Sequence, residues 1–257
     1  MVLEGLPAES GQREAFTAAA AKEGFGALPS GRTRIMHRAD LSGGMEAYLS
    51  KRTATFRKSR RRHMNQCHRA GEVELVTYRG ENIRRGLSIL FELERHTWKA
   101  DPTRNDARMR VPLDDRIRLF LTEVGTAFAS SDDAVVIVMN FNGIPVGAMM
   151  GVSRRSMMLA LLTYLRDDMR DTLNTYPLMD AFIQDAIAHG MTSLDMNGVT
   201  EYTRRWATHE DRYQRLYIFS RHPKARILQV SKALATNLSQ LSRSVEWDRN
   251  GDDDGSH

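Results

Sequence analysis

The sequence contains very little cysteine, and Cys67 is the only one among its 257 residues. A disulfide within the chain is therefore impossible, and a cysteine-rich metal site is excluded. We expect a protein of the reducing cytoplasm that binds no metal. Because Cys67 lies in a basic helical stretch without a nucleophile motif around it, we interpret it as structural and not as a catalytic thiol.

Long apolar runs are also missing. The longest, at 134–139 and 157–162, are of strand length, whereas a membrane-spanning helix needs roughly 20 apolar residues. The N-terminus has no basic region followed by an apolar one, so we predict neither a signal peptide nor a transmembrane segment. Hydrophobic residues still make up 41% of the chain, which is enough for a packed core and too many for a disordered protein.

Acidic residues are absent between Glu46 and Glu72. Since the whole chain carries +5 and this interval +8, the remainder carries 5 − 8 = −3. The positive charge is thus local. Three interpretations are open: a solvated helix face, a surface for an acidic substrate (a polysaccharide, a nucleotide-linked sugar or an anionic membrane), or a tRNA-binding surface. The cations are Lys51, Arg52, Arg57, Lys58, Arg60, Arg61, Arg62 and Arg69.

Hydrophobic periodicity predicts an α/β (α+β) protein. The clearest signal is a pair of apolar runs, 134–141 and 144–152, joined by Asn142-Gly143, a dipeptide typical of a β-hairpin turn. Further strands are expected over 33–36, 72–78, 156–164, 192–196 and 213–220. Helices are expected over 14–22, 44–70, 82–99, 113–129, 177–189, 200–206 and from 223 onward, with a charged loop at 103–110. This order predicts a mixed, mostly antiparallel sheet flanked by helices.

Three stretches carry a resemblance to a known family. They are the basic helix at 53–75, the pair Trp98-Lys99 after Glu94, and residues 174–208 with Arg215-Leu216-Tyr217 beyond them. Together with the element order, they resemble the GNAT-type domain of the BioF2-like, or CelD-type, acetyltransferases, which are related to the Fem peptidyltransferases. We predict an N-terminal accessory remnant over 1–44, a GNAT-like domain over 45–221, a C-terminal helix over 222–246 and a disordered tail over 247–257.

The segment that should bind the donor departs from the family pattern. A GNAT domain holds the pyrophosphate of coenzyme A with backbone N–H groups at a helix N-terminus. Residues 164–176 contain no glycine, and the family's Ser-Pro-Gly is Thr175-Tyr176-Pro177 here. The resemblance implies an acyl-CoA donor, and the missing glycines keep aminoacyl-tRNA or a carrier-protein thioester open. The predicted donor-binding residues are Asn174, Thr175, Arg57, Arg60, Arg61 and Arg62.

Three residues are candidates for catalysis. Asp195 ends a predicted strand, where α/β proteins collect ligands, although a turn aspartate bonded to its own backbone is the alternative. Glu94 at a helix end is placed to take a proton from the acceptor, against the alternative of a plain surface helix end. The resemblance gives Tyr202 the protonation of the leaving group. The predicted substrate-binding residues are His96, Trp98, Lys99, Tyr164, Arg205 and Trp206, of which Trp206 also suits the core.

The resemblance implies transfer of an acyl group, with acyl-CoA as co-substrate, to an amine or hydroxyl of a small-molecule or saccharide-like acceptor. Two alternatives stay open: an aminoacyl-tRNA-dependent transferase of the Fem kind, with tRNA as a partner, and a GNAT-like binding module without catalysis. The sequence is compatible with a homodimer, and it names neither the acceptor nor the choice between N- and O-transfer.

Overall fold

The computed structural model describes residues 1–8, 10–30, 33–100 and 115–234. The chain divides into two compact units: His37–His209, and Met1–Met36 together with Glu210–His257. In this division the last strand groups with the N-terminal segment, and the predicted domain boundaries at 44 and 221 stay a prediction. The predicted loop at 103–110 and the tail from 247 lie outside the described residues. None of the described helices is both long and apolar enough to cross a membrane.

The larger unit is built on one sheet with the strand order β3–β8–β7–β6–β5–β4. Neighbouring strands are antiparallel except β7 and β8, which are parallel. The predicted mixed, mostly antiparallel sheet is therefore confirmed. The strands are β3 (Arg34–Asp40), β4 (Val73–Tyr78), β5 (Ala134–Phe141), β6 (Ile144–Arg154), β7 (Met157–Leu165) and β8 (Ser193–Asp195).

The hairpin between β5 and β6 turns at the predicted dipeptide. Asn142 and Gly143 have φ angles of 50° and 77°, and positive φ at both central residues is the requirement of a type I′ turn. Phe141 pairs with Ile144 across it. An antiparallel hairpin over 134–152 is thus confirmed.

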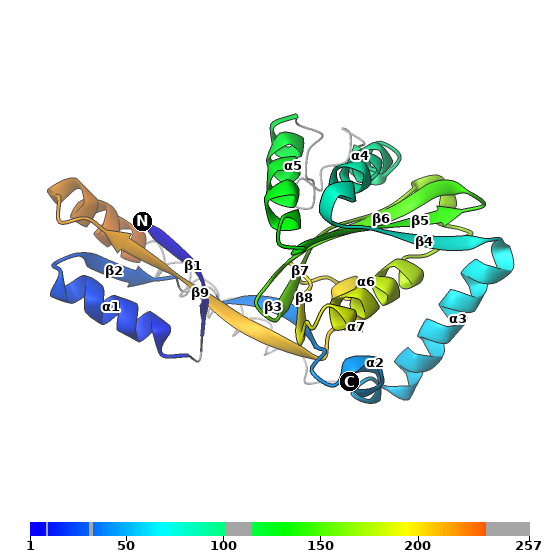
Figure 1. Cartoon of the computed structure of the whole chain (residues 1–257). Coiled ribbons are helices and arrows are strands. Elements are labelled where there is room, and N and C mark those ends of the chain that lie inside the picture. Colours follow the sequence, from blue (N-terminus) through cyan, green and yellow to red (C-terminus); the bar gives the residue numbers. More distant parts are fainter. Residues whose placement is uncertain (9, 31–32, 101–114, 235–257) are drawn as a thin grey trace, which may run out of the picture. The chain divides into compact units, whose positions relative to one another are not determined.

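Helices cover both faces of this sheet (Figure 1). On one face lie α4 (Ile83–Glu94) and α5 (Asp115–Ala129), and on the other lie α3 (Ala54–Ala70) and α6 (Tyr176–Ala188). Alternate residues of β5 enter the two cores: Val135 and Ile137 join the α3–α6 side, and Val136 and Val138 the α4–α5 side. Burial on both faces explains why β5 is an unbroken apolar run.

Two predicted helices are shorter than expected. The helix expected over 44–70 is broken into α2 (Gly44–Ser50) and α3, because Thr53 adopts an extended conformation and its side chain accepts from the Phe56 N–H as an N-cap. The helix expected over 82–99 ends at Glu94, where the N–H groups of Arg95, His96 and Thr97 bond to the third residue back instead of the fourth. Trp98–Ala100 then form a single 3₁₀ turn.

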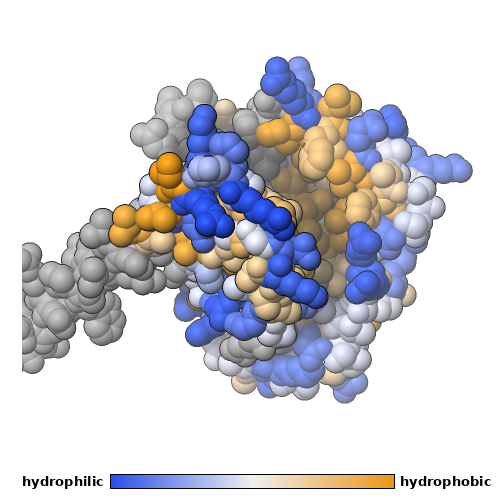
Figure 2. All heavy atoms as spheres, turned by 90° about the vertical axis from the view of Figure 1, so that its left-hand side faces the viewer, coloured by the Kyte–Doolittle hydropathy of each residue, from blue (hydrophilic) through white to orange (hydrophobic). Residues whose placement is uncertain are grey.

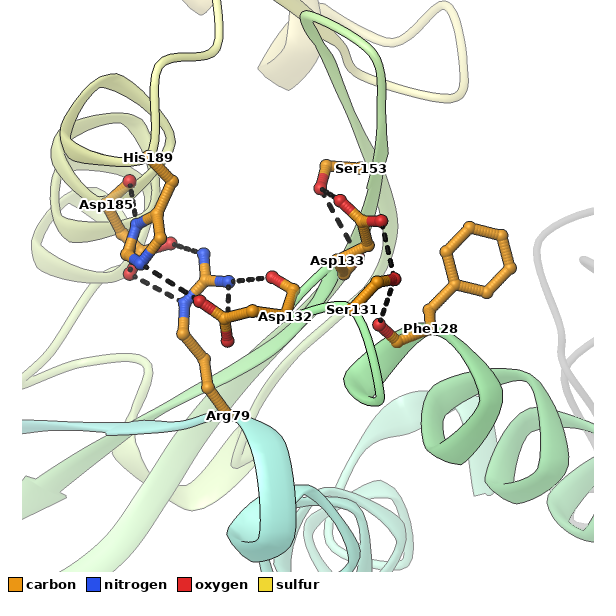
Figure 3. Close-up of polar contacts among 8 residues, drawn as sticks. All are labelled: Arg79, Phe128, Ser131, Asp132, Asp133, Ser153, Asp185 and His189. Atoms are coloured by element: carbon orange, nitrogen blue, oxygen red, sulfur yellow. Dashed lines mark hydrogen bonds and ion pairs between the residues drawn. The ribbon is translucent and has the colours of Figure 1, made fainter.

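A polar cluster fixes the C-terminal end of α6 to the sheet (Figure 3). The guanidinium of Arg79, just after β4, donates to both carboxylate oxygens of Asp185 at 2.5 and 3.3 Å and to the Asp132 carbonyl at 2.7 Å. The His189 ring lies 3.6 Å from the Asp132 carboxylate and 3.6 Å from the Asp185 carboxylate. The cluster joins three elements through groups that satisfy one another, so we interpret it as structural.

The smaller unit contains β1 (Val2–Pro7), α1 (Gln12–Lys22), β2 (Gly26–Pro29) and β9 (His209–Phe219), followed by a helix whose described part is 223–234. Both β1 and β2 pair antiparallel with β9. The sequence predicted neither β1 nor β2, because each is short and lacks a clear alternation.

Hydrophilic side chains cover much of the face shown in Figure 2, with smaller hydrophobic groups among them.

Candidate functional site

The strands β7 and β8 separate after three paired residues. Met157–Leu159 pair with Ser193–Asp195, where β8 ends, while β7 continues to Leu165. In the pairing with β6, Met150 faces Leu162 and Gly151 faces Ala160, so Leu161 is the extra residue of a bulge in β7. Within the described chain, β7 therefore has no β8 partner beyond Leu159, and the two strands diverge there.

A cleft of about 630 Å³ occupies this opening, a volume typical of small-molecule sites. Its floor is β7, and its walls are the segment before α6 and the segment 196–203 leading into α7 (Glu201–Trp206). The lining is mainly apolar, and Trp98 and Leu162 reach it from the α4 side of the sheet while Met179 reaches it from α6. Other apolar lining residues are Ala160, Leu161, Leu165, Leu173 and Met196.

Most polar side chains of the cleft are already bonded within the protein. Thr200 and Thr203 cap α7 reciprocally, and the Thr203 hydroxyl also lies 2.7 Å from His37 Nδ1. The side-chain oxygen of Asn174 accepts from the Tyr176 N–H at 3.0 Å, and its side-chain amide nitrogen donates to the main-chain carbonyl of His63 at 3.3 Å. A ligand in this cleft must therefore bond mainly to the backbone or to the few remaining side-chain groups.

Tyr202 supplies one of those remaining groups. Its hydroxyl oxygen is buried and has no hydrogen-bond partner in the described chain. Burial raises the pKa of the phenol, and the side chain of Thr175 lowers it by less. The phenol thus keeps its proton at neutral pH, and Tyr202, as a residue that lines the cleft, is a potential proton donor.

In the segment before α6, residues 166–175, several side chains and N–H groups bond to partners within the segment itself. Arg166 donates to both oxygens of Asp168 at 3.0 and 2.7 Å, and Arg170 lies 2.5 Å from Asp167. The N–H groups of Thr172 and Leu173 bond to the Met169 carbonyl at 3.1 and 2.7 Å. The Tyr176 N–H is bonded to the Asn174 side chain, and Pro177 has no N–H. The N-terminus of α6 therefore has few N–H groups left that could bind an anion.

A second polar group lies on the α4–α5 side of β7. Glu94 is 2% exposed. Burial raises the pKa of the Tyr164 phenol, the adjacent Glu94 carboxylate raises it further, and Arg118 of α5 lowers it. The Arg118 Nε is buried without a hydrogen-bond partner in the described chain. A buried acid, a phenol and a guanidinium thus lie together next to the strand that floors the cleft.

Arg118 was not predicted as a site residue, although the sequence holds a signal for it. Leu121 and Gly125 are buried on α5, and Arg118 precedes them by three and seven residues, on the same helix face. An arginine on the buried face of an amphipathic helix usually has a partner or a ligand.

Asp195 does not line the cleft. Its carboxylate accepts from the Asn197 N–H at 2.8 Å and lies 3.4 Å from the Arg38 guanidinium. This is the turn aspartate that the sequence left as an alternative, and its catalytic role stays a prediction without support from the geometry.

The other predicted substrate-binding residues are dispersed. Trp98 lines the cleft, whereas His96 is exposed and lies 3.9 Å from Glu92, and the Lys99 side chain lies outside the described atoms. Arg205 is exposed and lies 3.7 Å from Glu201. Trp206 is 0% exposed and packs on Phe56 and Tyr176, so it belongs to the core and cannot touch a substrate.

The four predicted arginines of the basic helix have different surroundings. Arg60 lies 2.5 Å from Asp180, which is 1% exposed, and Arg57 donates to the carbonyls of Leu49 and Arg52 that end α2. These two arginines are structural. Arg61 and Arg62 are exposed, and so remain available to a ligand.

The comparisons with known proteins identify the class. Residues 54–215 match the family described as "Acetyltransferase (GNAT) domain", and the chain belongs to this family. No curated protein matches the sequence.

Solved structures share the fold at low identity. FemX is similar with a TM-score of 0.59 and 12% identity, over 82% of this chain and 71% of that one. The structure of L-PGS from Bacillus licheniformis gives 0.51 and 14%, over 92% and 72%. The C-terminal domain of a putative lysylphosphatidylglycerol synthetase from Agrobacterium fabrum gives 0.56 and 9%, over 91% and 71%.

Proposed function

We propose that this protein transfers an acyl group from a pantetheine thioester, such as acyl-CoA, to an amine or hydroxyl of a small or saccharide-like acceptor. The observation that carries the proposal is the apolar cleft along the edge of β7 that β8 does not cover. An extended pantetheine arm can run along this edge as an added strand would. The apolar lining accepts the acyl chain without unpaired polar groups.

The reaction needs a polarised carbonyl, a base and an acid. A backbone N–H near the bulge at Leu161 polarises the thioester carbonyl. The acceptor nitrogen or oxygen forms a bond to that carbon, and the C–S bond breaks. Tyr202 gives its proton to the departing thiolate, while Glu94, across β7, receives the proton of the acceptor through Tyr164 or water.

Transfer from aminoacyl-tRNA is the second candidate. The exposed arginines of α3 favour it, and so does the fold shared with FemX. The terminal adenosine of a tRNA, however, needs hydrogen-bond partners, and the side chains of Asn174, Thr200 and Thr203 are already engaged. We therefore place the thioester first. We also infer from the single, buried Cys67 that the protein works in the cytoplasm.

A melting-temperature panel tests the proposal. Acetyl-CoA and acetyl-pantetheine should raise the melting temperature, because a ligand that binds only the folded state stabilises it. Val199, which lines the cleft and is 52% exposed, offers a variant that fills the mouth without disturbing the core. The shift should vanish in Val199→Trp and persist in the control Ile144→Trp, whose residue is 56% exposed on the hairpin. A shift with total tRNA alone would favour the second candidate.

A further inference from the structure

The deep part of the cleft is an apolar slot on the α6 side of the sheet. Six residues that line the cleft also belong to the hydrophobic core on that side, and each of them is at most 7% exposed. They come from β6, β7, α6 and the segments that precede α6 and follow β8. We call these six residues the deep slot: Met149, Ala160, Leu165, Leu173, Met179 and Met196.

The deep slot is suited to an unbranched hydrocarbon chain. A polar group placed among these side chains would lose its contacts with water without gaining a hydrogen bond, which costs free energy. Because the lining residues are so little exposed, the space between them is narrow, and a linear chain fits it better than a ring or a branched group. Three of the six are methionines, whose flexible side chains adapt to the shape of an apolar ligand.

An acetyl group is too small to use this slot. The whole cleft has a volume of about 630 Å³, whereas an apolar cavity of about 150 Å³ already holds a molecule of the size of benzene. The single methyl of an acetyl group would contact only the nearest of the six side chains. A longer chain buries further methylenes, and each buried methylene strengthens binding.

Tyr202 places the deep slot on the donor side of the reaction. Its ring packs against the same core cluster as the six slot residues, and it lines the same cleft. Glu94, the base of the proposed function, ends α4 on the opposite face of the sheet. The leaving sulfur, which receives the proton of Tyr202, and the acyl chain are bonded to one carbonyl carbon. The chain therefore belongs on the Tyr202 side, and the acceptor approaches from the Glu94 side.

We propose that the acyl group transferred by this protein is a linear, saturated chain several methylenes longer than acetyl, and that the deep slot holds it. The inference rests on the proposed function, specifies its acyl group and adds no step to the reaction. An apolar acceptor is the other molecule that could occupy the slot. The position of Tyr202 favours the donor, and competition experiments separate the two.

The test uses two variants that change the size of the slot in opposite directions. Ala160→Leu fills it, and Leu173→Ala enlarges it. The control Ala127→Leu makes the first change at an exposed position of α5. Isothermal titration gives the Kd of acetyl-, butanoyl-, octanoyl- and dodecanoyl-CoA, all below their micelle concentrations, and circular dichroism checks that each variant is folded. The octanoyl-CoA and acetyl-CoA titrations are repeated in the presence of 1-octanol.

Wild type and control should bind more tightly by about three- to fourfold for each methylene added between acetyl and octanoyl. Ala160→Leu should bind acetyl-CoA like the wild type and octanoyl-CoA at least about tenfold more weakly than the wild type does. Leu173→Ala should gain more than the wild type between octanoyl and dodecanoyl. 1-Octanol should compete with octanoyl-CoA and leave the Kd of acetyl-CoA unchanged, because only the longer chain enters the slot.

A Kd that does not depend on chain length in the wild type would overturn the inference and leave the proposed function standing. The same chain-length dependence in the wild type and both slot variants would also overturn it. If Ala160→Leu does not fold, Leu173→Ala decides alone. Binding of 1-octanol together with octanoyl-CoA, without competition, would assign the slot to the acceptor. If no thioester of any length binds, the proposed function itself fails, and the inference fails with it.

Discussion

Buried polar side chains fall into two kinds in this protein. Arg60 and Asp180 are paired at 2.5 Å, and Gln184 donates to the second oxygen of Asp180 at 2.7 Å, so this buried carboxylate is satisfied. The Tyr202 hydroxyl is equally buried but unsatisfied. Removal of a satisfied group should cost stability, while removal of an unsatisfied one should cost mainly function. Each kind supports a prediction with a different measurement.

Tyr202→Phe should lower turnover about 10²-fold or more, because the leaving thiolate loses its proton donor. The melting temperature should stay the same or rise slightly, because the phenylalanine ring fills the same space without a buried hydroxyl. Rates are measured with an acyl thioester and thermal unfolding by circular dichroism. A fully active Tyr202→Phe would remove this residue from the mechanism.

Arg60→Leu should lower the free energy of unfolding by about 3–5 kcal/mol, because the Asp180 carboxylate remains buried without its partner. Arg61→Leu, one residue on but exposed, should change it by less than about 0.5 kcal/mol. Urea denaturation measures both. The double variant Arg60→Leu, Asp180→Leu should recover part of the loss, and a loss as large as the sum of the single ones would contradict the pairing.

Among the elements, those with strong local signals are the ones that the sequence predicts. The β5–β6 hairpin follows from Asn142-Gly143 and two apolar runs, and α6 follows from its periodicity and its early proline. The cleft does not follow in this way. It depends on where β8 stops and on the bulge at Leu161, and both are decided by pairing between residues far apart in the sequence. The residues that flank the cleft could be predicted in part, but not their roles.

The break between α2 and α3 shows a local signal that was present but ambiguous. Lys51, Arg52 and Thr53 lie between two stretches that favour helix. Only Thr53 interrupts the pattern, because it caps the start of α3. Thr53→Ala should lower the free energy of unfolding by about 1 kcal/mol, since the Phe56 N–H loses its acceptor. Thr53→Ser keeps a hydroxyl and should retain most of the stability. Urea denaturation of the two variants measures the difference, and equal loss in both would show that the cap does not stabilise α3.

Over the whole molecule, charge is divided unevenly between α3 with its flanking residues and the remainder, +8 against −3. Part of the +8 is neutralised internally, since Arg60 pairs with Asp180 and Lys51 lies 2.6 Å from Asp40. The positive surface of α3 is therefore narrower than the sequence suggests. It includes Lys58, Arg61, Arg62 and Arg69, which are exposed on the outer face of the helix. We call these four residues the α3 stripe. Uneven charge of this kind governs how a protein meets charged partners more than net charge does.

Two proteins of identical net charge should therefore behave differently on a cation exchanger. The stripe variant replaces the four residues of the α3 stripe by glutamine, and its control replaces four other exposed arginines, Arg84, Arg85, Arg154 and Arg155, in the same way. Both variants carry 5 − 4 = +1. The control keeps the α3 stripe intact and should elute at higher salt, near the wild type, because a dense local patch binds the resin through several charges at once. The stripe variant should elute markedly earlier. Elution is recorded at pH 7.5 in a linear salt gradient, and light scattering first checks that all three proteins have the same oligomeric state. Coincident elution of the two variants would mean that the positive field of the molecule does not originate on α3.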